Sequence, residues 1–348
     1  MGNHRGFMNK PLIALMAFIA IAVGPAPARA DFAADWEQFK HQYIIPDGRV
    51  VDTGNNGVSH TEGQGTALLC AVAANDHAAF DSILLWTTAN FDLNGNGLYA
   101  RLWRPNQGVT TSDDAADGDI LITWALIRAD EKWHVPAYRA RALRSIGAIK
   151  TMLLQERDGF EILLPGSEGF DQPKAVTINL GYWIFPAFKT FAKLDKDPVW
   201  ARLGSDGLRL IALARFGQDQ LPADWVDLSG QDDLAPSHLY PPRFGHDAMR
   251  IPLYLAWGSD HSNRLAALEA PFLTHWDHYQ GRKMPAWLDV TTGDTAPFPA
   301  SSGYRAVMAI ARRAVSTAPS SLPALTKTMD YEAASLLMLA ELSATARH

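Results

Sequence analysis

Apolar residues recur at three- and four-residue spacing along most of the chain, a pattern typical of helices with one buried face. Short loops rich in Gly, Pro, Asp and Asn separate the periodic stretches. Strand patterns are few, and the best is Phe160 to Leu164, between two turns. We therefore expect an all-α fold, a toroid of helical hairpins with minor short strands. The predicted helices cover roughly 33–43, 62–90, 119–132, 137–156, 179–193, 198–216, 245–258, 262–277, 303–317 and 330–345.

The N-terminal segment has the pattern of a cleaved secretory signal. Arg5 and Lys10 precede an apolar run from Pro11 to Val23, and the segment ends in Ala28-Arg29-Ala30. A membrane anchor is the alternative, but a spanning helix needs roughly 20 apolar residues and prolines follow this run closely. We expect cleavage after Ala30, a secreted or periplasmic protein, and no membrane insertion once the signal is removed.

Composition limits what the remaining 31–348 segment can be. It contains no Ser/Gly/Pro-rich linker, so we expect one domain after the signal peptide at 1–30. Its 28 basic and 37 acidic residues give a net charge of −9, which argues against nucleic acid or anionic membranes as partners. Cys70 is the only cysteine, so no internal disulfide can form and the hydrophobic core must hold the fold.

Tryptophan is the second compositional clue. The chain has 11 Trp, and Trp103, Trp225 and Trp257 stand near Gly/Pro-rich turns or polar clusters. The apolar face of a sugar ring can stack on an indole, so tryptophans near carboxylates suggest a carbohydrate cleft. The alternative for each is a place in the core, where Trp is usually found.

Three acidic spots stand at the entrances of predicted helices: Glu62 within 60–65, the acids of 113–119, and Asp247 within 243–250. In a helical toroid alternate loops gather at one end, so such acids can converge on one cleft. Each acid could instead cap its helix and interact with the macrodipole, the interpretation we prefer for Asp113 and Asp114. For Glu62, capping leaves the glycines on both sides of Gln64 unexplained, because glycine allows backbone or ligand to approach closely.

Paired carboxyl groups point to one chemistry in particular. Glycoside hydrolysis needs one carboxyl group that protonates the leaving oxygen and another that activates water or attacks carbon. Other hydrolase patterns are missing: the sequence has no G-x-S-x-G and no H-E-x-x-H. Asp92 to Gly97 imitates a calcium loop, but Trp103 stands where that loop needs Glu, so we interpret the segment as a turn. We expect neither a metal nor a cofactor.

The motifs along the chain resemble glycoside hydrolase family 8, in the branch of bacterial cellulases associated with cellulose-synthesis operons. Each motif is modest alone, whereas their order and spacing together are specific. They are WEQFKHQYIIPDGRVVD at 36–52, HTEGQG at 60–65, AADGD at 115–119, NLGYWIFPAF at 179–188, LPADWV at 221–226, PPRFGHDAMRIPLYLAW at 241–257 and WLDVTTG at 287–293.

The resemblance implies an (α/α)6 barrel that inverts configuration at the anomeric carbon. By position, Glu62 resembles the family's general acid, Asp247 its general base, and Asp117 the acid that holds the sugar beside the cleavage point. Four more positions match substrate-binding residues: Tyr182 and Arg250 resemble residues that position the water, and Trp103 and Trp225 resemble sugar platforms.

The chain departs from the family pattern at positions close to these acids. Thr66-Ala67 stand where the family usually has Tyr-Gly, Ala116 replaces a Ser or Thr, and His246 replaces a Tyr. No departure removes a catalytic carboxylate, but each can change subsite shape, pH optimum or rate. A protonated His246 would favour the carboxylate form of Asp247.

The resemblance implies a secreted endo-β-1,4-glucanase whose partner is cellulose or cello-oligosaccharides, with the cellulose synthase complex as a candidate second partner. Two alternatives stay open. One is a related hydrolase of xylan or chitosan, although the HDA element favours the glucanase branch. The other is a glucan-binding protein that has lost most of its activity through the departures. Neither a biosynthetic nor a degradative role follows from the residues, and the oligomeric state does not either.

Overall fold

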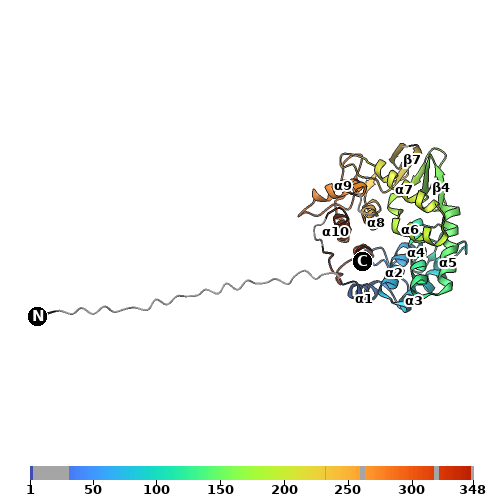
Figure 1. Cartoon of the computed structure of the whole chain (residues 1–348), viewed down its shortest axis with the longest axis horizontal. Helices are drawn as coiled ribbons and strands as arrows, with labels where there is room; N and C mark the ends of the chain where they lie inside the picture. The colour runs from blue at the N-terminus through green and yellow to red at the C-terminus, as the bar shows by residue number, and fades with distance from the viewer. Residues whose placement is uncertain (3–30, 232, 259–262, 317–320, 346–348) are drawn as a thin grey trace.

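The computed structural model describes residues 1–2, 31–231, 233–258, 263–316 and 321–345, so nearly all of the predicted signal segment lies outside the described residues. In the described part, helices dominate and strands are short, which confirms the predicted all-α class (Figure 1). The α-helices are α1 (Phe32–Tyr43), α2 (Thr61–Ala74), α3 (His77–Phe91), α4 (Ala116–Trp133), α5 (Pro136–Ala148), α6 (Phe185–Asp195), α7 (Val199–Leu213), α8 (Ile251–Gly258), α9 (Asn263–Asp277), α10 (Tyr304–Val315) and α11 (Tyr331–Thr345).

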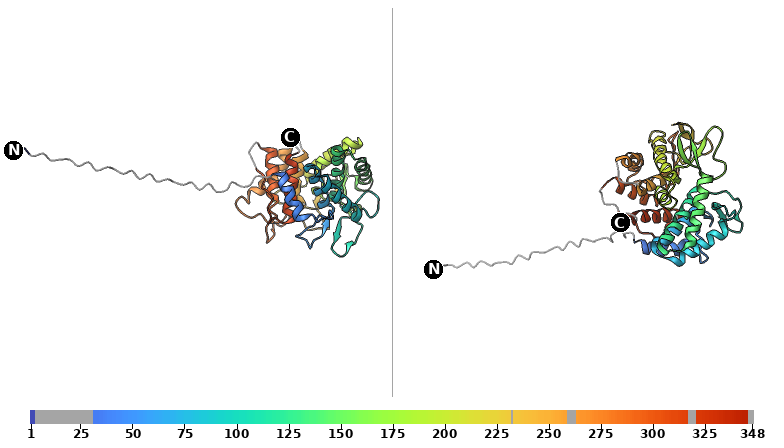
Figure 2. Two further views of the ribbon diagram at one scale, coloured as in Figure 1. Left: turned by 90° about the horizontal axis from the view of Figure 1, so that it is seen from below. Right: turned by 45° about the vertical axis from the view of Figure 1, so that its right-hand side comes forward.

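Six of these helices form a closed inner ring. Contacts run from α2 to α4, α6, α8, α10 and α11 in turn, and α11 packs back against α2. The other helices lie outside: α3 packs on α2, α5 on α4, α7 on α6, α9 on α8 and α10, and α1 on α2 and α11. Burial agrees with this, because α2, α4 and α11 are buried on nearly all sides, as expected for helices surrounded by protein. Figure 2 shows the first and last helices side by side.

The predicted helix at 62–90 is in fact two helices. Asn75 adopts a left-handed conformation with φ of 59° and ends α2. Asp76 then caps α3, its side chain accepting a hydrogen bond of 3.1 Å from the backbone N–H of Ala79. An Asn-Asp pair suits this junction because both residues favour turns and caps, so the apolar periodicity alone concealed the break.

Three other predicted helices differ at their ends. The helix expected to reach residue 156 ends at Ala148, where a π-helical turn, η1 (Ile149–Leu153), leads into a strand. The helices expected at 179 and 245 begin later, after the 3-10 turns η2 (Leu180–Tyr182) and η3 (Ala248–Arg250). Proline at the second position of both α6 and α8 explains the late starts, because proline is favoured in the first helical turn.

Within the described residues, four small antiparallel sheets lie outside the ring of helices, which agrees with the prediction of minor strands. The expected strand at 160–164 is β5 (Phe160–Leu163), which pairs with β4 (Leu154–Arg157). The other sheets consist of β1 (Ser59–His60), β2 (Leu102–Arg104) and β3 (Gly108–Val109); β6 (Val176–Ile178), β7 (Val226–Gly230) and β8 (Asp233–Pro236); and β9 (Arg243–Phe244) with β10 (Leu288–Asp289).

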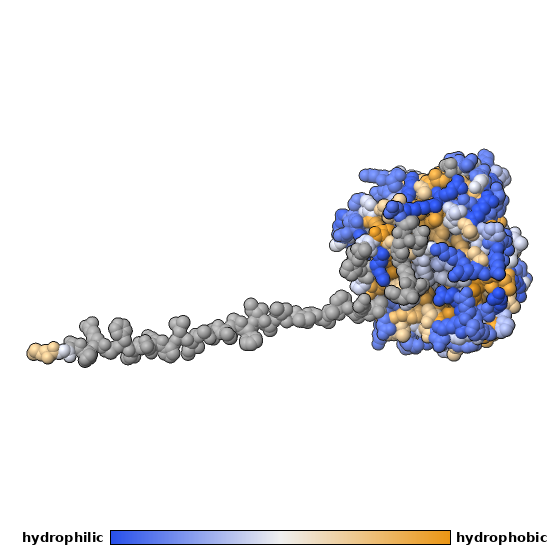
Figure 3. Space-filling view, viewed as in Figure 1, coloured by the Kyte–Doolittle hydropathy of each residue, from blue (hydrophilic) through white to orange (hydrophobic). Residues whose placement is uncertain are grey.

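The face of the molecule seen in Figure 3 is mostly hydrophilic, with smaller groups of hydrophobic side chains between the hydrophilic ones. Within the described residues, no helix is both long enough and apolar enough to span a membrane. Cys70 is buried in α2, as expected for a free cysteine in an apolar stretch.

Candidate active site

The ends of the inner helices bring the predicted site residues together. Glu62 is the second residue of α2, Asp117 the second residue of α4, and Asp247 immediately precedes η3 and α8. Tyr182 ends η2 just before α6, and Arg250 ends η3. All five line one cavity of about 560 Å³. The expected convergence of helix entrances on one cleft is therefore present in the fold.

Arg250 links the three predicted carboxyl groups. Its side chain is only 2% exposed, and its Nη1 donates to Glu62 Oε1 and, at 3.5 Å, to Asp117 Oδ2. Its Nη2 donates to Asp247 Oδ1 at 2.5 Å. Burial disfavours the charged guanidinium, but the three acids outweigh burial and raise the pKa of Arg250 above its ordinary value. Arg250 thus fixes the carboxylates relative to one another, a task that the sequence did not assign to it.

Asp117 is the most deeply buried of the three acids, with 4% exposure. Burial, followed by the negative charge of Glu62, raises the pKa of Asp117 to about 7. Its Oδ1 accepts a hydrogen bond of 2.8 Å from the backbone N–H of Gly118. Near neutral pH this cluster of three carboxyl groups around one guanidinium can therefore hold an additional proton, shared among coupled groups.

Glycine is required where α2 meets its neighbours. A Cβ added to Gly63 would lie 2.0 Å from the Tyr331 hydroxyl oxygen, and one on Gly65 would lie 2.6 Å from Leu121 Cβ. The glycines that flank Gln64 therefore serve helix packing, and they let α2 approach α4 and α11 closely enough to present Glu62 in the shared cavity.

Asp224 is a residue of this region that the sequence did not single out. Its Oδ1 accepts hydrogen bonds from the backbone N–H groups of Gly245, at 3.0 Å, and Ala248, at 2.8 Å. Burial and the nearby charge of Asp247 raise the pKa of Asp224 to about 7. It thus holds the loop that carries Asp247. In the sequence, Asp224 is recognisable only as the single acid of the otherwise apolar segment LPADWV. Nothing in that segment indicates that Asp224 contacts the loop at 245–248.

The tryptophans lie farther out than expected. Neither Trp103 nor Trp225 lines the cavity that contains the acids. The Arg49 guanidinium lies 4.6 Å from the Trp103 ring centroid. Trp225 stacks on Tyr240 with ring centroids 4.3 Å apart and touches Tyr182 edge-on at 6.2 Å. Trp225 therefore borders the site through Tyr182, and both sugar platforms stay predictions.

Trp257, the third tryptophan that stands near a turn or polar cluster in the sequence, lies elsewhere in the fold. It packs against Trp124 with centroids 4.9 Å apart and lines a separate cavity with Arg128 and Lys132. None of the three predicted acids lines that cavity. Its place near a turn was therefore a poor guide to its surroundings.

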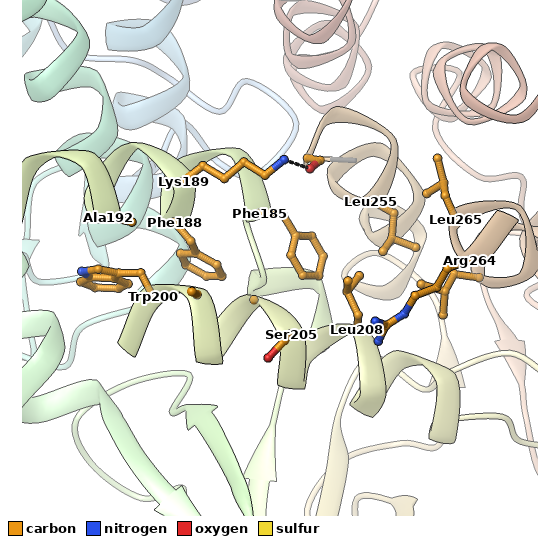
Figure 4. A pocket seen from close by; sticks show the side chains of 14 residues that line it. Phe185, Phe188, Lys189, Ala192, Trp200, Ser205, Leu208, Leu255, Arg264 and Leu265 are labelled. Atoms are coloured by element: carbon orange, nitrogen blue, oxygen red, sulfur yellow. Dashed lines mark hydrogen bonds between the residues drawn. The ribbon is translucent and has the colours of Figure 1, made fainter. Parts of the chain in front are cut away.

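A second sizeable cavity, of about 440 Å³, lies among α6, α7, α8 and α9 (Figure 4). Phe185, Phe188, Leu208 and Leu255 make its walls apolar, and Lys189 at its edge donates to the Gly258 carbonyl. None of the described residues that line it carries a carboxyl group, whereas hydrolysis of a glycoside requires two. Among the described residues, no group of three or more His, Cys, Asp or Glu is arranged to hold a metal ion.

Comparison with known proteins agrees with the geometry. The sequence profile of glycosyl hydrolases family 8 matches residues 6–345, nearly the entire chain, so the chain belongs to this family. It is 37% identical over 301 residues to an endoglucanase from Cellulomonas uda, covering 85% of this chain and 82% of that protein. It is 35% identical over 319 residues to a probable endoglucanase from Novacetimonas hansenii, covering 90% and 91%.

Solved structures show the same relationship. Endo-β-1,4-glucanase CMCax from Acetobacter xylinum superposes with a TM-score of 0.83 at 34% identity, covering 90% of this chain and 98% of that chain. Endoglucanase Cel10 from Klebsiella pneumoniae gives 0.84 at 35% identity, covering 90% and 100%. The barrel implied by the family resemblance is thereby confirmed, and the protein is a glycoside hydrolase.

Proposed function

We propose that this protein is an exported, inverting endo-β-1,4-glucanase that cleaves cellulose-type glucans, with Glu62 as general acid and Asp247 as general base. The observation that carries the proposal is the set of three carboxyl groups held by Arg250 in one cavity. The substrate class is supported by the relatives at 34–37% identity, which are described as endoglucanases or endo-β-1,4-glucanases.

In the proposed reaction Glu62 protonates the glycosidic oxygen while Asp247 removes a proton from a water that attacks the anomeric carbon from the opposite face. Inversion requires room for that water, with the two carboxyl groups roughly 6.5–9.5 Å apart. Glu62 and Asp247 bind different terminal nitrogens of the Arg250 guanidinium, so the guanidinium holds the proposed acid and the proposed base in a fixed relation to each other.

Asp117 has a supporting role in this scheme. Because its pKa is raised to about 7, it carries a proton in weakly acidic solution, where it can donate a hydrogen bond to a sugar hydroxyl. Its neutral form also removes one negative charge from the neighbourhood of Glu62, which lessens the repulsion among the three carboxyl groups. Tyr182 lies over Arg250, 5.7 Å from the guanidinium carbon to the ring centroid, and closes that side of the cavity.

Export and the biological setting belong to the same proposal. Export rests on the basic start, apolar run and Ala28-Arg29-Ala30 ending of the N-terminal segment. A link to cellulose biosynthesis, with the cellulose synthase complex as partner, rests only on motif resemblance to cellulases of those operons. A protease-protection assay on cells that express the full chain tests export, since a cytoplasmic, uncleaved protein would contradict it.

A reducing-sugar assay on carboxymethylcellulose, xylan and chitosan tests the substrate class. We expect new reducing ends from carboxymethylcellulose, with a rapid fall in viscosity because internal bonds are cut. Activity confined to xylan or chitosan would identify the related hydrolase instead. Binding to cello-oligosaccharides without new reducing ends would identify a glucan-binding protein.

A further inference from the structure

The residue immediately before the proposed base makes an unusual contact. His246 lines the acidic cavity with 56% of its side chain exposed, and its Nδ1 lies 2.9 Å from Oε1 of Glu332, the second residue of α11. An ionised carboxylate can only accept, so Nδ1 carries the hydrogen. This pair joins the Asp247 loop to a helix 86 positions farther along the chain.

Tyr304, the first residue of α10, completes the attachment. Its hydroxyl lies 2.9 Å from the His246 carbonyl oxygen and 3.3 Å from Glu332 Oε1. On the other side, Asp224 accepts from the backbone N–H groups of Gly245 and Ala248. The four-residue loop at 245–248 is therefore fixed from both sides, by its backbone and by the imidazole.

The surrounding charges keep the imidazole protonated. Glu332 from α11, Asp247 on the same loop and Arg250 from η3 all act on His246. Desolvation and Arg250 disfavour its charged form, but the hydrogen bond to Glu332 and the negative charges of Asp247 and Glu332 together outweigh them and raise the pKa of His246 to about 9. Burial favours the neutral form of Glu332, yet the hydrogen bond and positive charge of His246, with smaller contributions from Tyr304 and Arg250, together hold the pKa of Glu332 below its ordinary value.

We propose that His246, paired with Glu332, is a positioning residue for Asp247: it fixes the loop that carries the base, and its positive charge favours the carboxylate form that the base requires. This inference rests on the proposed function, because Asp247 must be ionised only if it activates water. It concerns a position at which this chain departs from the usual tyrosine of its family.

Two charge variants give graded expectations. His246→Asn keeps a neutral N–H donor near the position of Nδ1, so kcat at the optimum stays within about threefold, but the lost cation moves the acid limb of kcat/KM about 0.5 pH unit upward. Glu332→Gln removes the partner that keeps the imidazole charged, so one positive and one negative charge are lost together and the acid limb moves less than in His246→Asn. KM for cellohexaose is unchanged in both variants.

A third variant tests positioning. His246→Leu removes charge and hydrogen bond together, and we expect kcat to fall about tenfold with little change in KM. His238→Asn is the matched control, because His238 also pairs with a carboxylate, that of Asp227, and does not line the catalytic cavity. Its pH profile should coincide with that of the wild type.

An acid limb of His246→Asn that stays in place or moves downward would overturn the electrostatic part. A His246→Leu variant with wild-type kcat would overturn positioning, and if that variant does not fold, His246→Asn still tests the electrostatic part. A wild-type protein that does not hydrolyse β-1,4-glucan would instead defeat the proposed function, and this outcome is distinguishable because it precedes any comparison of variants.

Discussion

Arg250 explains how three acids can share one cavity. A buried guanidinium is costly unless it is paired, and three carboxyl groups so close together repel one another, so each side needs the other. The planar fork of arginine presents two terminal nitrogens in fixed geometry, which a lysine could not reproduce. The site is therefore preorganised before substrate enters, and binding need not assemble the acid and the base.

The roles of Glu62 and Asp247 can be separated by the leaving group of the substrate. Glu62→Gln keeps the shape but removes the transferable proton, so activity on cellohexaose should fall by about 100-fold or more. A nitrophenyl glucan needs little protonation, and on it Glu62→Gln should recover much of its rate. Asp247→Asn should not recover there, because water activation is still missing.

Steady-state kinetics on both substrates measure this difference, with isothermal titration of cello-oligosaccharides as the control for intact binding. Two observations would contradict the assignment. One is a Glu62→Gln variant that stays active on cellohexaose, and the other is an identical response of both variants to the leaving group.

The predicted sugar platforms are testable in the same titration. If each indole stacks on a sugar ring, Trp103→Ala and Trp225→Ala should each weaken the binding of a long oligosaccharide by about 1–3 kcal/mol. The matched control is Trp257→Ala, since Trp257 packs on Trp124 beside a different cavity. Unchanged affinity together with a lower melting temperature would return Trp103 and Trp225 to a structural role.

At the level of helices and strands, the acids of the site lie where inner helices begin. Glu62 and Asp117 occupy the first turns of α2 and α4, where unpaired backbone N–H groups and the macrodipole favour negative charge. The inner helices α2, α4 and α8 begin at the same end of the ring. The helix starts, where negative charge is favoured, therefore meet at one cavity and bring the acids together there. An interaction with the macrodipole and a catalytic role are thus compatible for the same acids, whereas the N-cap positions, His60 and Ala115, make no side-chain cap hydrogen bond.

The junction of α1 and α11 predicts a pH dependence of stability. Asp35 of α1 and Glu341 of α11 are 4% and 3% exposed. Burial, together with the nearby Asp35, raises the pKa of Glu341 to about 9 in the folded protein. In the unfolded chain a glutamate has a pKa near ~4.3. Because the folded state holds this proton more tightly, the stabilisation is complete below about pH 4 and is lost as pH rises towards 9.

Glu341→Gln removes the titration while keeping the size of the side chain. Its melting temperature should exceed that of the wild type at pH 9 and should fall less between pH 5 and 9. Calorimetry across this range measures the effect, with Glu131→Gln, an exposed acid on α4, as the control. Parallel pH dependences of the wild type and Glu341→Gln would show that this carboxyl group is not the source.

Sequence periodicity was a good guide to most helices and a poor one to their ends. Apolar spacing cannot register the Asn75-Asp76 break, because both flanking segments continue the same pattern. It likewise missed η2 and η3, which contain apolar residues that continue the helical spacing but whose backbone follows a tighter turn before Pro186 and Pro252. Local propensity decides such ends, whereas periodicity reports only which face is buried.

At the scale of the whole molecule, closure of the ring brings distant residues together. Glu62 and Arg250 are 188 positions apart, and His246 and Glu332 are 86 apart. Motif resemblance identified Glu62, Asp117, Asp247 and Arg250 as parts of one site, but no pattern in the chain indicates that Arg250 bridges the acids or that Glu332 faces the loop. Such contacts depend on packing across the ring, so only the three-dimensional structure reveals them.

The stereochemistry of the first product distinguishes an inverting from a retaining mechanism. Wild-type protein is added to cellohexaose in the spectrometer, and proton NMR follows the anomeric signals before mutarotation. An acid and a base that act on opposite faces of the sugar predict that the α-anomer appears first from this β-linked substrate. Initial appearance of the β-anomer would contradict the account, because it requires a covalent intermediate and a nucleophile where Asp247 is proposed to be a base.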